Sequence, residues 1–161
     1  MVGHVAPGLY AELTDVPLLL QYPTQELGGS TCDAFAQNHD VAPTILGALG
    51  VAAPVRMEGT DLGKLVLGEL PARQYVTAGM DDFVWCRDES HVYFARNDGR
   101  DARLFDLCTD PEQQKNVASE RPSVVQMMFE RILSDAGGPL PDYRHLREQT
   151  AAEWWELYRF R

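Results

Sequence analysis

The first half of the chain changes its hydrophobic pattern at short intervals. Residues 16–22 (Val-Pro-Leu-Leu-Leu-Gln-Tyr) form a continuous apolar run without alternation, which is typical of a strand covered on both faces of an α/β sheet. Residues 23–39 are rich in Gly, Thr, Ser and Asn and predict a surface connection. A helix is expected to begin at Asp40, its N-cap, and to end at Leu49, with Gly50 as its stop.

One face of this predicted helix is apolar, because Val41, Ile45, Leu46 and Leu49 recur at helical spacing. Pro43 falls in the first turn, where its missing N–H costs little.

The second half is patterned as short strands followed by a helix. Turn-forming residues separate the strand candidates, as an antiparallel meander requires, and Asn97-Asp98-Gly99 is the clearest turn. The predicted strands cover residues 73–78, 82–87, 91–96 and 103–107.

A helix over residues 121–136 should lie across this meander. It has Pro122 near its start and Gly137-Gly138-Pro139 at its end. Its apolar face consists of Val125, Met128, Phe129, Ile132 and Ala136.

The fold class predicted from these elements is α+β. We expect residues 1–70 to form one part, residues 71–140 a small four-stranded antiparallel sheet packed by a helix, and residues 141–161 a tail. Trp154 and Trp155 lie among charged residues of the tail, which predicts a short helix docked back on the domain or a contact to another subunit.

Composition and charge narrow the class of protein. At 161 residues and 45% hydrophobic, the chain can bury a core. The chain has 14 basic and 24 acidic residues. The resulting net charge of −10 argues against nucleic acid and anionic membranes as partners. The sequence has no apolar run of membrane-spanning length and no basic start followed by an apolar stretch, so the expected location is cytoplasmic.

The three cysteines, Cys32, Cys86 and Cys108, are odd in number and form no CxxC pair. We expect them to be free thiols, buried or half-buried.

Four segments together resemble the last third of the sulfatase family of the alkaline-phosphatase superfamily. Leu9 to Tyr22 reads LYAELTDVPLLLQY and is similar to the family's LYEE-x-x-x-VPLII stretch, while His39 to Val51 resembles DLAPTLLDLAGV. Glu58 to Leu62 is similar to the xGxSL turn, and Leu104 to Ala118 resembles LYDLxxDPxExxNLA. The resemblance covers roughly residues 3–135, in keeping with a domain-sized match. It implies that residues 1–70 are the end of an alkaline-phosphatase-like α/β domain.

The resemblance also implies a hydrolase of sulfate esters. In that family a formylglycine, made from Cys or Ser in C/S-x-P-x-R, attacks sulfur, while calcium or magnesium and basic side chains hold the developing charge. Cys32, Cys86 and Cys108 have no such context, and no serine has Pro at +2 with Arg at +4. The family's metal ligands precede the stretch where this chain begins, so we expect no cofactor here. The adjacent pair Asp81-Asp82 falls at a predicted turn.

His4 is the one candidate remnant of the active site, because it lies near where the family places a basic residue that contacts sulfate. A terminal histidine without function is the alternative. The other histidines, His39, His91 and His145, lack ligand spacing and are expected to be structural or exposed.

The sequence therefore predicts a C-terminal fragment of a sulfatase-like hydrolase, inactive in isolation. Its expected partner is the missing N-terminal catalytic region or a second copy of the chain, because the apolar surface and backbone groups of segment 16–22 must be covered by other polypeptide. Two alternatives stay open: a parent that acts on phosphonate or phosphate esters, and a stand-alone binding or accessory module.

Overall fold

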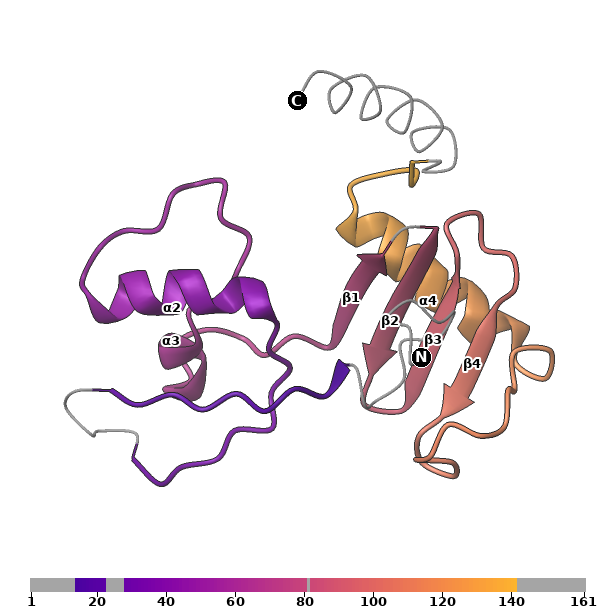
Figure 1. Ribbon diagram of the computed structural model, residues 1–161, viewed down its shortest axis with the longest axis horizontal. Helices are drawn as coiled ribbons and strands as arrows, with labels where there is room; N and C mark the ends of the chain where they lie inside the picture. Colours follow the sequence, from indigo (N-terminus) through magenta and orange to yellow (C-terminus); the bar gives the residue numbers. More distant parts are fainter. Residues whose placement is uncertain (1–13, 23–27, 81, 142–161) are drawn as a thin grey trace, which may run out of the picture. The chain divides into compact units, whose positions relative to one another are not determined.

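The computed structural model describes residues 14–22, 28–80 and 82–141. These residues form two compact units: residues 15–76, here called the helical unit, and the described residues from Thr77 onward, here called the sheet unit. Figure 1 shows the elements of each unit. Within the described ranges, no helix is long and apolar enough to cross a membrane.

The helical unit is built around a short helix that the sequence predicts. The 3-10 helix η1 (Asn38–Asp40) continues directly into α2 (Val41–Ala48). The helix ends because Gly50 adopts a φ of 67°, which lets the N–H of Val51 donate to the carbonyl of Leu46 at 2.9 Å. The predicted helix 40–49 and its stop at Gly50 are thus confirmed.

The second helix of this unit was not expected. Residues Leu62–Val66 form α3, which contacts α2, where the sequence predicts only a turn over residues 58–62. Asp61 caps this helix, because its Oδ1 accepts the N–H of Gly63 at 3.0 Å and of Lys64 at 3.4 Å. Five residues are too few to show helical periodicity in a sequence.

The strand predicted over residues 16–22 is absent. This segment has neither strand nor helix, and Leu19 is 93% exposed. A strand is stabilised by hydrogen bonds to a neighbour, and no described strand lies beside this segment. The apolar face of α2 is also open: Ile45 is 55% and Leu49 70% exposed, while Pro43 and Thr44 are buried.

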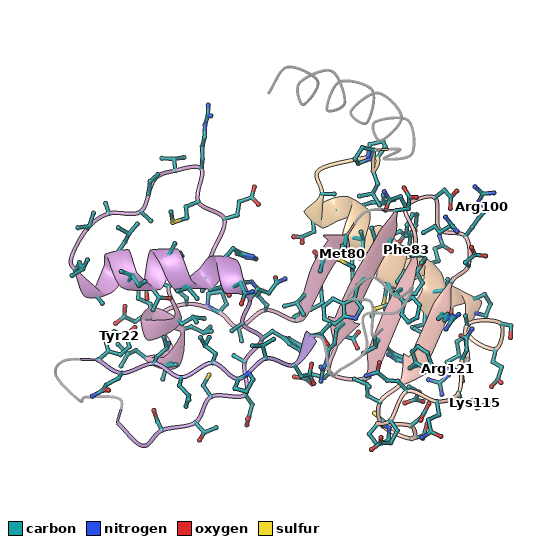
Figure 2. The ribbon with its side chains drawn as sticks, in the orientation of Figure 1. Tyr22, Met80, Phe83, Arg100, Lys115 and Arg121 are labelled. Atoms are coloured by element: carbon teal, nitrogen blue, oxygen red, sulfur yellow. The ribbon has the colours of Figure 1, made fainter. Side chains whose placement is uncertain are left out.

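The predicted meander is confirmed in the sheet unit. Four strands lie in the order β1-β2-β3-β4, and β2–β3 and β3–β4 pair antiparallel. Figure 2 labels Met80 and Phe83, which flank the turn between β1 and β2. The register aligns Cys86 with Tyr93 and Tyr93 with Leu104. The bounds are Tyr75–Met80 (β1), Phe83–Asp88 (β2), His91–Arg96 (β3) and Arg103–Asp106 (β4).

One helix, α4 (Pro122–Asp135), covers a face of this sheet, as the sequence predicts. Met128 and Ile132 are its buried side chains, and the Sγ of Cys86 lies 4.0 Å from the Sδ of Met128. The helix ends where Gly137 adopts a φ of 73°.

The hydrophobic core belongs almost entirely to the sheet unit. Its buried side chains come from β2, β3, β4 and α4, and they include Val84, Trp85, Cys86, Val92, Tyr93, Phe94, Leu104, Phe105, Met128 and Ile132. Among the described residues of the helical unit, the buried hydrophobic side chains are Leu62 and, at the start of β1, Val76.

Candidate functional site

The three cysteines are free, as predicted, but only Cys86 is buried. Burial raises the pKa of the Cys86 thiol to about 12, so this group stays protonated at neutral pH. Cys32 and Cys108 are exposed, which corrects the expectation of burial for these two. Cys108 follows β4, and its backbone N–H donates to Asp106 Oδ1 at 3.0 Å, so this position is fixed by turn hydrogen bonding.

A first polar cluster lies in the helical unit around Asp40, whose side chain is 0% exposed. Arg73 makes a two-point contact with this carboxylate, from Nη1 to Oδ2 at 2.5 Å and from Nη2 to Oδ1 at 2.6 Å. The backbone N–H groups of Gln37 and Thr60 donate to the same carboxylate, each at 2.7 Å. His39 lies beside this cluster, with its Nε2 3.6 Å from Asp40 Oδ1.

These contacts determine the charge of Asp40. Burial alone would raise the pKa of the carboxyl group, but the hydrogen bonds from Arg73, Thr60 and Gln37 outweigh it and hold the pKa below its usual range. The carboxylate is therefore ionised and fully engaged at neutral pH. It joins three stretches of chain, and this arrangement indicates a structural clamp rather than a catalytic base.

A second polar cluster connects the sheet to α4. Asp88 at the end of β2 accepts a hydrogen bond from Arg131 Nη1 at 2.6 Å, and Asp106 at the end of β4 pairs with Arg121 Nη2 at 2.6 Å. His91 lies between the two pairs: its Nδ1 is 3.7 Å from Asp88 Oδ1, and its Nε2 is 3.1 Å from Arg121 Nη1. Figure 2 labels Arg121 near β4.

Arg121 and Asp88 lie beside the two ring nitrogens of His91. Arginine has no acceptor atom, so in a hydrogen bond between Arg121 Nη1 and His91 Nε2 the arginine is the donor. Burial would raise the pKa of Asp88, but the hydrogen bond from Arg131 and the N–H groups of Ser90 and His91 lower it. Every charge in the cluster has an opposite charge beside it.

The described part of the chain also forms a wide-open pocket of about 650 Å³ in the sheet unit. Its two cations are paired within the protein, since Arg96 binds Asp101 at 2.8 Å and Arg100 binds Asp98 at 2.5 Å. The remaining lining includes Phe129, Leu133 and Leu140. Because both guanidinium groups already have carboxylate partners, this pocket lacks the open cation that would hold a sulfate or phosphate.

The predicted site residues are only partly within the described structure. His4, the candidate sulfate contact, lies outside the described residues, as do His145, Asp81 and the Trp154-Trp155 tail. His39 and His91 fall in two different polar clusters. Asp82 lies in the turn between β1 and β2, as the sequence predicts.

The described residues do not fit the calcium or magnesium ion that a sulfatase would carry. Such an ion needs several oxygen ligands converging on one point. Among the residues placed by the structure, no three His, Cys, Asp or Glu side chains are grouped so that they could hold a metal.

The sequence reveals neither polar cluster. It predicts Asp40 only as a helix N-cap, and Arg73, the partner of this residue, lies 33 residues further on. The spacing of Asp88 and His91, three residues apart across a turn, was a local signal for the second cluster. No sequence spacing marks Arg121 and Arg131 as partners of carboxylates on different strands.

The chain is similar in sequence to known proteins. The family described as N-sulphoglucosamine sulphohydrolase, C-terminal, matches residues 8–82. The N-acetylglucosamine-6-O-sulfatase of Bacteroides thetaiotaomicron is 27% identical in an alignment that covers 76% of this chain and 25% of that protein.

Two solved structures share the fold. One is a protein in complex with its substrate D-glucosamine-2-N,6-O-disulfate, with a TM-score of 0.54, 20% identity, and coverage of 66% of this chain and 25% of that one. The other is the phosphonate monoester hydrolase of Agrobacterium radiobacter, with a TM-score of 0.54, 23% identity, and coverage of 64% and 25%. The chain thus spans about a quarter of the length of the relatives it matches.

Proposed function

Because this chain corresponds to the C-terminal portion of sulfatase-family proteins, we propose that it is the C-terminal fragment of a hydrolase of sulfate esters. In this proposal residues 1–70 are the end of an alkaline-phosphatase-like α/β domain, and residues 71–140 are the small domain that follows it. The catalytic nucleophile and the metal ligands belong to upstream residues that this chain does not contain.

One observation carries this proposal: the matched region is a quarter of the relatives' length, and it contains no C/S-x-P-x-R motif. Formylglycine needs that motif, and a divalent ion needs a convergent set of ligands that the described residues do not supply. Without the nucleophile and the cation, the barrier to S–O cleavage is not lowered.

The isolated chain should therefore show no turnover of an aryl sulfate. We expect purified residues 1–161, incubated with the ester and either calcium or magnesium, to release phenol at the rate of a protein-free control. The Bacteroides sulfatase relative, assayed on its own substrate, verifies the metal and buffer. Turnover by the chain above the control would contradict the proposal.

A stand-alone binding module is the alternative, and the core of the sheet unit is the observation that favours it. The genomic DNA upstream of the Met1 codon separates the two hypotheses. An in-frame C/S-x-P-x-R coding region supports the fragment, while a promoter with an in-frame stop codon supports the module.

A further inference from the structure

The pocket of the sheet unit lies at the C-terminal end of α4. It is bordered by the turn between β3 and β4, which carries Arg100 (Figure 2), and by the residues that follow the helix. Its apolar lining consists of Phe129, Leu133 and Leu140, and all three side chains are half-buried. Among the described residues, an apolar pocket of about 650 Å³ is therefore left open to solvent.

The cations at the rim of this pocket already have partners inside the protein. Arg96 Nε lies 2.8 Å from Asp101 Oδ2, and Arg100 Nη2 lies 2.5 Å from Asp98 Oδ2. An anionic ligand would have to compete with these carboxylates, whereas an aromatic side chain would not. The pocket therefore fits an occupant that supplies hydrocarbon surface.

The chain itself arrives at the mouth of this pocket. Gly138, Pro139 and Leu140 are part of its lining, and Asn97 Nδ2 donates a hydrogen bond to the carbonyl oxygen of Pro141 at 2.9 Å. This bond joins the end of the described structure to the turn that borders the pocket. The segment that follows Pro141 therefore starts at the pocket rim.

This segment, residues 142–161, lies outside the described residues, and its sequence is rich in aromatic side chains, Trp154 and Trp155 among them. Burying such rings is strongly favourable. Because the segment is tethered at the pocket, closing it onto the pocket forms only a short loop. A contact to a second copy must also overcome the lost freedom of two separate molecules. The tether therefore favours the pocket of the same chain.

We propose that residues 142–161 fold back over this pocket and that Trp154 and Trp155 pack against its apolar lining. Of the two arrangements that the tail sequence predicts, this proposal selects docking on the same chain over contact to another subunit. The pocket is then an internal docking site, closed to outside ligands.

Tryptophan fluorescence tests this inference, because the emission of an indole ring moves to shorter wavelength when the ring leaves water. The spectrum of the unmodified chain minus that of the variant Trp154→Phe/Trp155→Phe isolates the two tail tryptophans from Trp85 in the core. We expect this difference spectrum to lie at shorter wavelength than that of the urea-unfolded chain. Leu133→Asp, with the same pair of proteins made in its background, should shift it to the unfolded position, because a carboxylate in the pocket opposes the packing of aromatic rings.

Met127→Asp is the matched control. It places the same carboxylate on the same helix, at a position that does not line the pocket, and it should leave the difference spectrum unchanged. Circular dichroism checks that Leu133→Asp is folded. If it is not, Leu140→Asp replaces it, because Leu140 lines the pocket but lies beyond the end of α4.

Three results would overturn the inference. If the tail tryptophans of the unmodified chain emit at the unfolded position, the segment is not docked. If a folded pocket variant leaves their emission unchanged, the segment does not occupy this pocket. If the emission of the unmodified chain moves to longer wavelength on dilution, the aromatic side chains contact a second copy.

Discussion

At the scale of single residues, Asp40 is the side chain on which the helical unit depends most. A carboxylate with no exposed surface is stable only if its oxygens are satisfied, and here a guanidinium and two backbone N–H groups satisfy them. Removing one partner of a buried ion pair costs more than the pair contributes, because the other charge stays buried.

Asp40→Asn should therefore lower the free energy of unfolding by about 2–4 kcal/mol, because it removes the charge of the buried carboxylate from the contact with Arg73. Urea unfolding at pH 7, followed by circular dichroism, measures the change. Asp101→Asn is the matched control: it breaks the exposed pair with Arg96, and asparagine tolerates the φ of 56° at this position. Equal midpoints for the two variants would contradict the role assigned to Asp40.

The ion pair of Asp88 should make the stability of the chain depend on pH. Its pKa is lowered in the folded chain, so the contribution of its ionised form is present above the unfolded pKa of about 4 and is lost as pH falls through the folded pKa. Arg131→Gln should destabilise the chain by about 1–2 kcal/mol at pH 7. The difference from the unmodified chain should shrink below about pH 4, as urea midpoints between pH 7 and pH 2 would show.

A difference that stays constant over this pH range would mean that Arg131 acts through packing. Its Nη1 also lies 3.2 Å from the Sδ of Met128, so such a role is physically available.

At the scale of elements, the sequence predicts the sheet unit well because its signals are local. Turn residues such as Gly99, which has a φ of 78°, separate the strands, and Pro122 and Gly137 bound α4. The prediction of a strand over residues 16–22 was wrong for the opposite reason. A strand forms only where a neighbouring strand supplies hydrogen bonds, and a local stretch of sequence does not show whether that neighbour is present. The open face of α2 has the same cause.

Two adjacent methionines of α4 provide a test of how this helix is attached. Met128 is 0% exposed, whereas Met127 is 37% exposed. Met128→Ala should cost about 2–4 kcal/mol of unfolding free energy, because it leaves a cavity beside Cys86, and Met127→Ala should cost far less. Urea unfolding followed by circular dichroism compares the two. Similar losses would show that α4 does not pack on the sheet through Met128.

At the scale of the whole molecule, the two units are stabilised by different interactions. The sheet unit has a core of closely packed apolar side chains. The described part of the helical unit is instead held by the contact between Asp40 and Arg73, and large hydrophobic side chains such as Leu19 and Leu49 are exposed there. The sequence could reveal the resemblance to sulfatases, because each motif is a short local run of residues. It could not reveal the clamp, since Asp40 and Arg73 are 33 residues apart and nothing local pairs them.

The position of Arg73 has a consequence for synthesis on the ribosome. This residue is almost the last of the helical unit, and it closes the clamp around a carboxylate made much earlier. While the nascent chain stops short of Arg73, Asp40 has no guanidinium and keeps its hydration shell. The helical unit should therefore settle late in translation, at about the moment when the first strand of the meander follows it out of the exit tunnel.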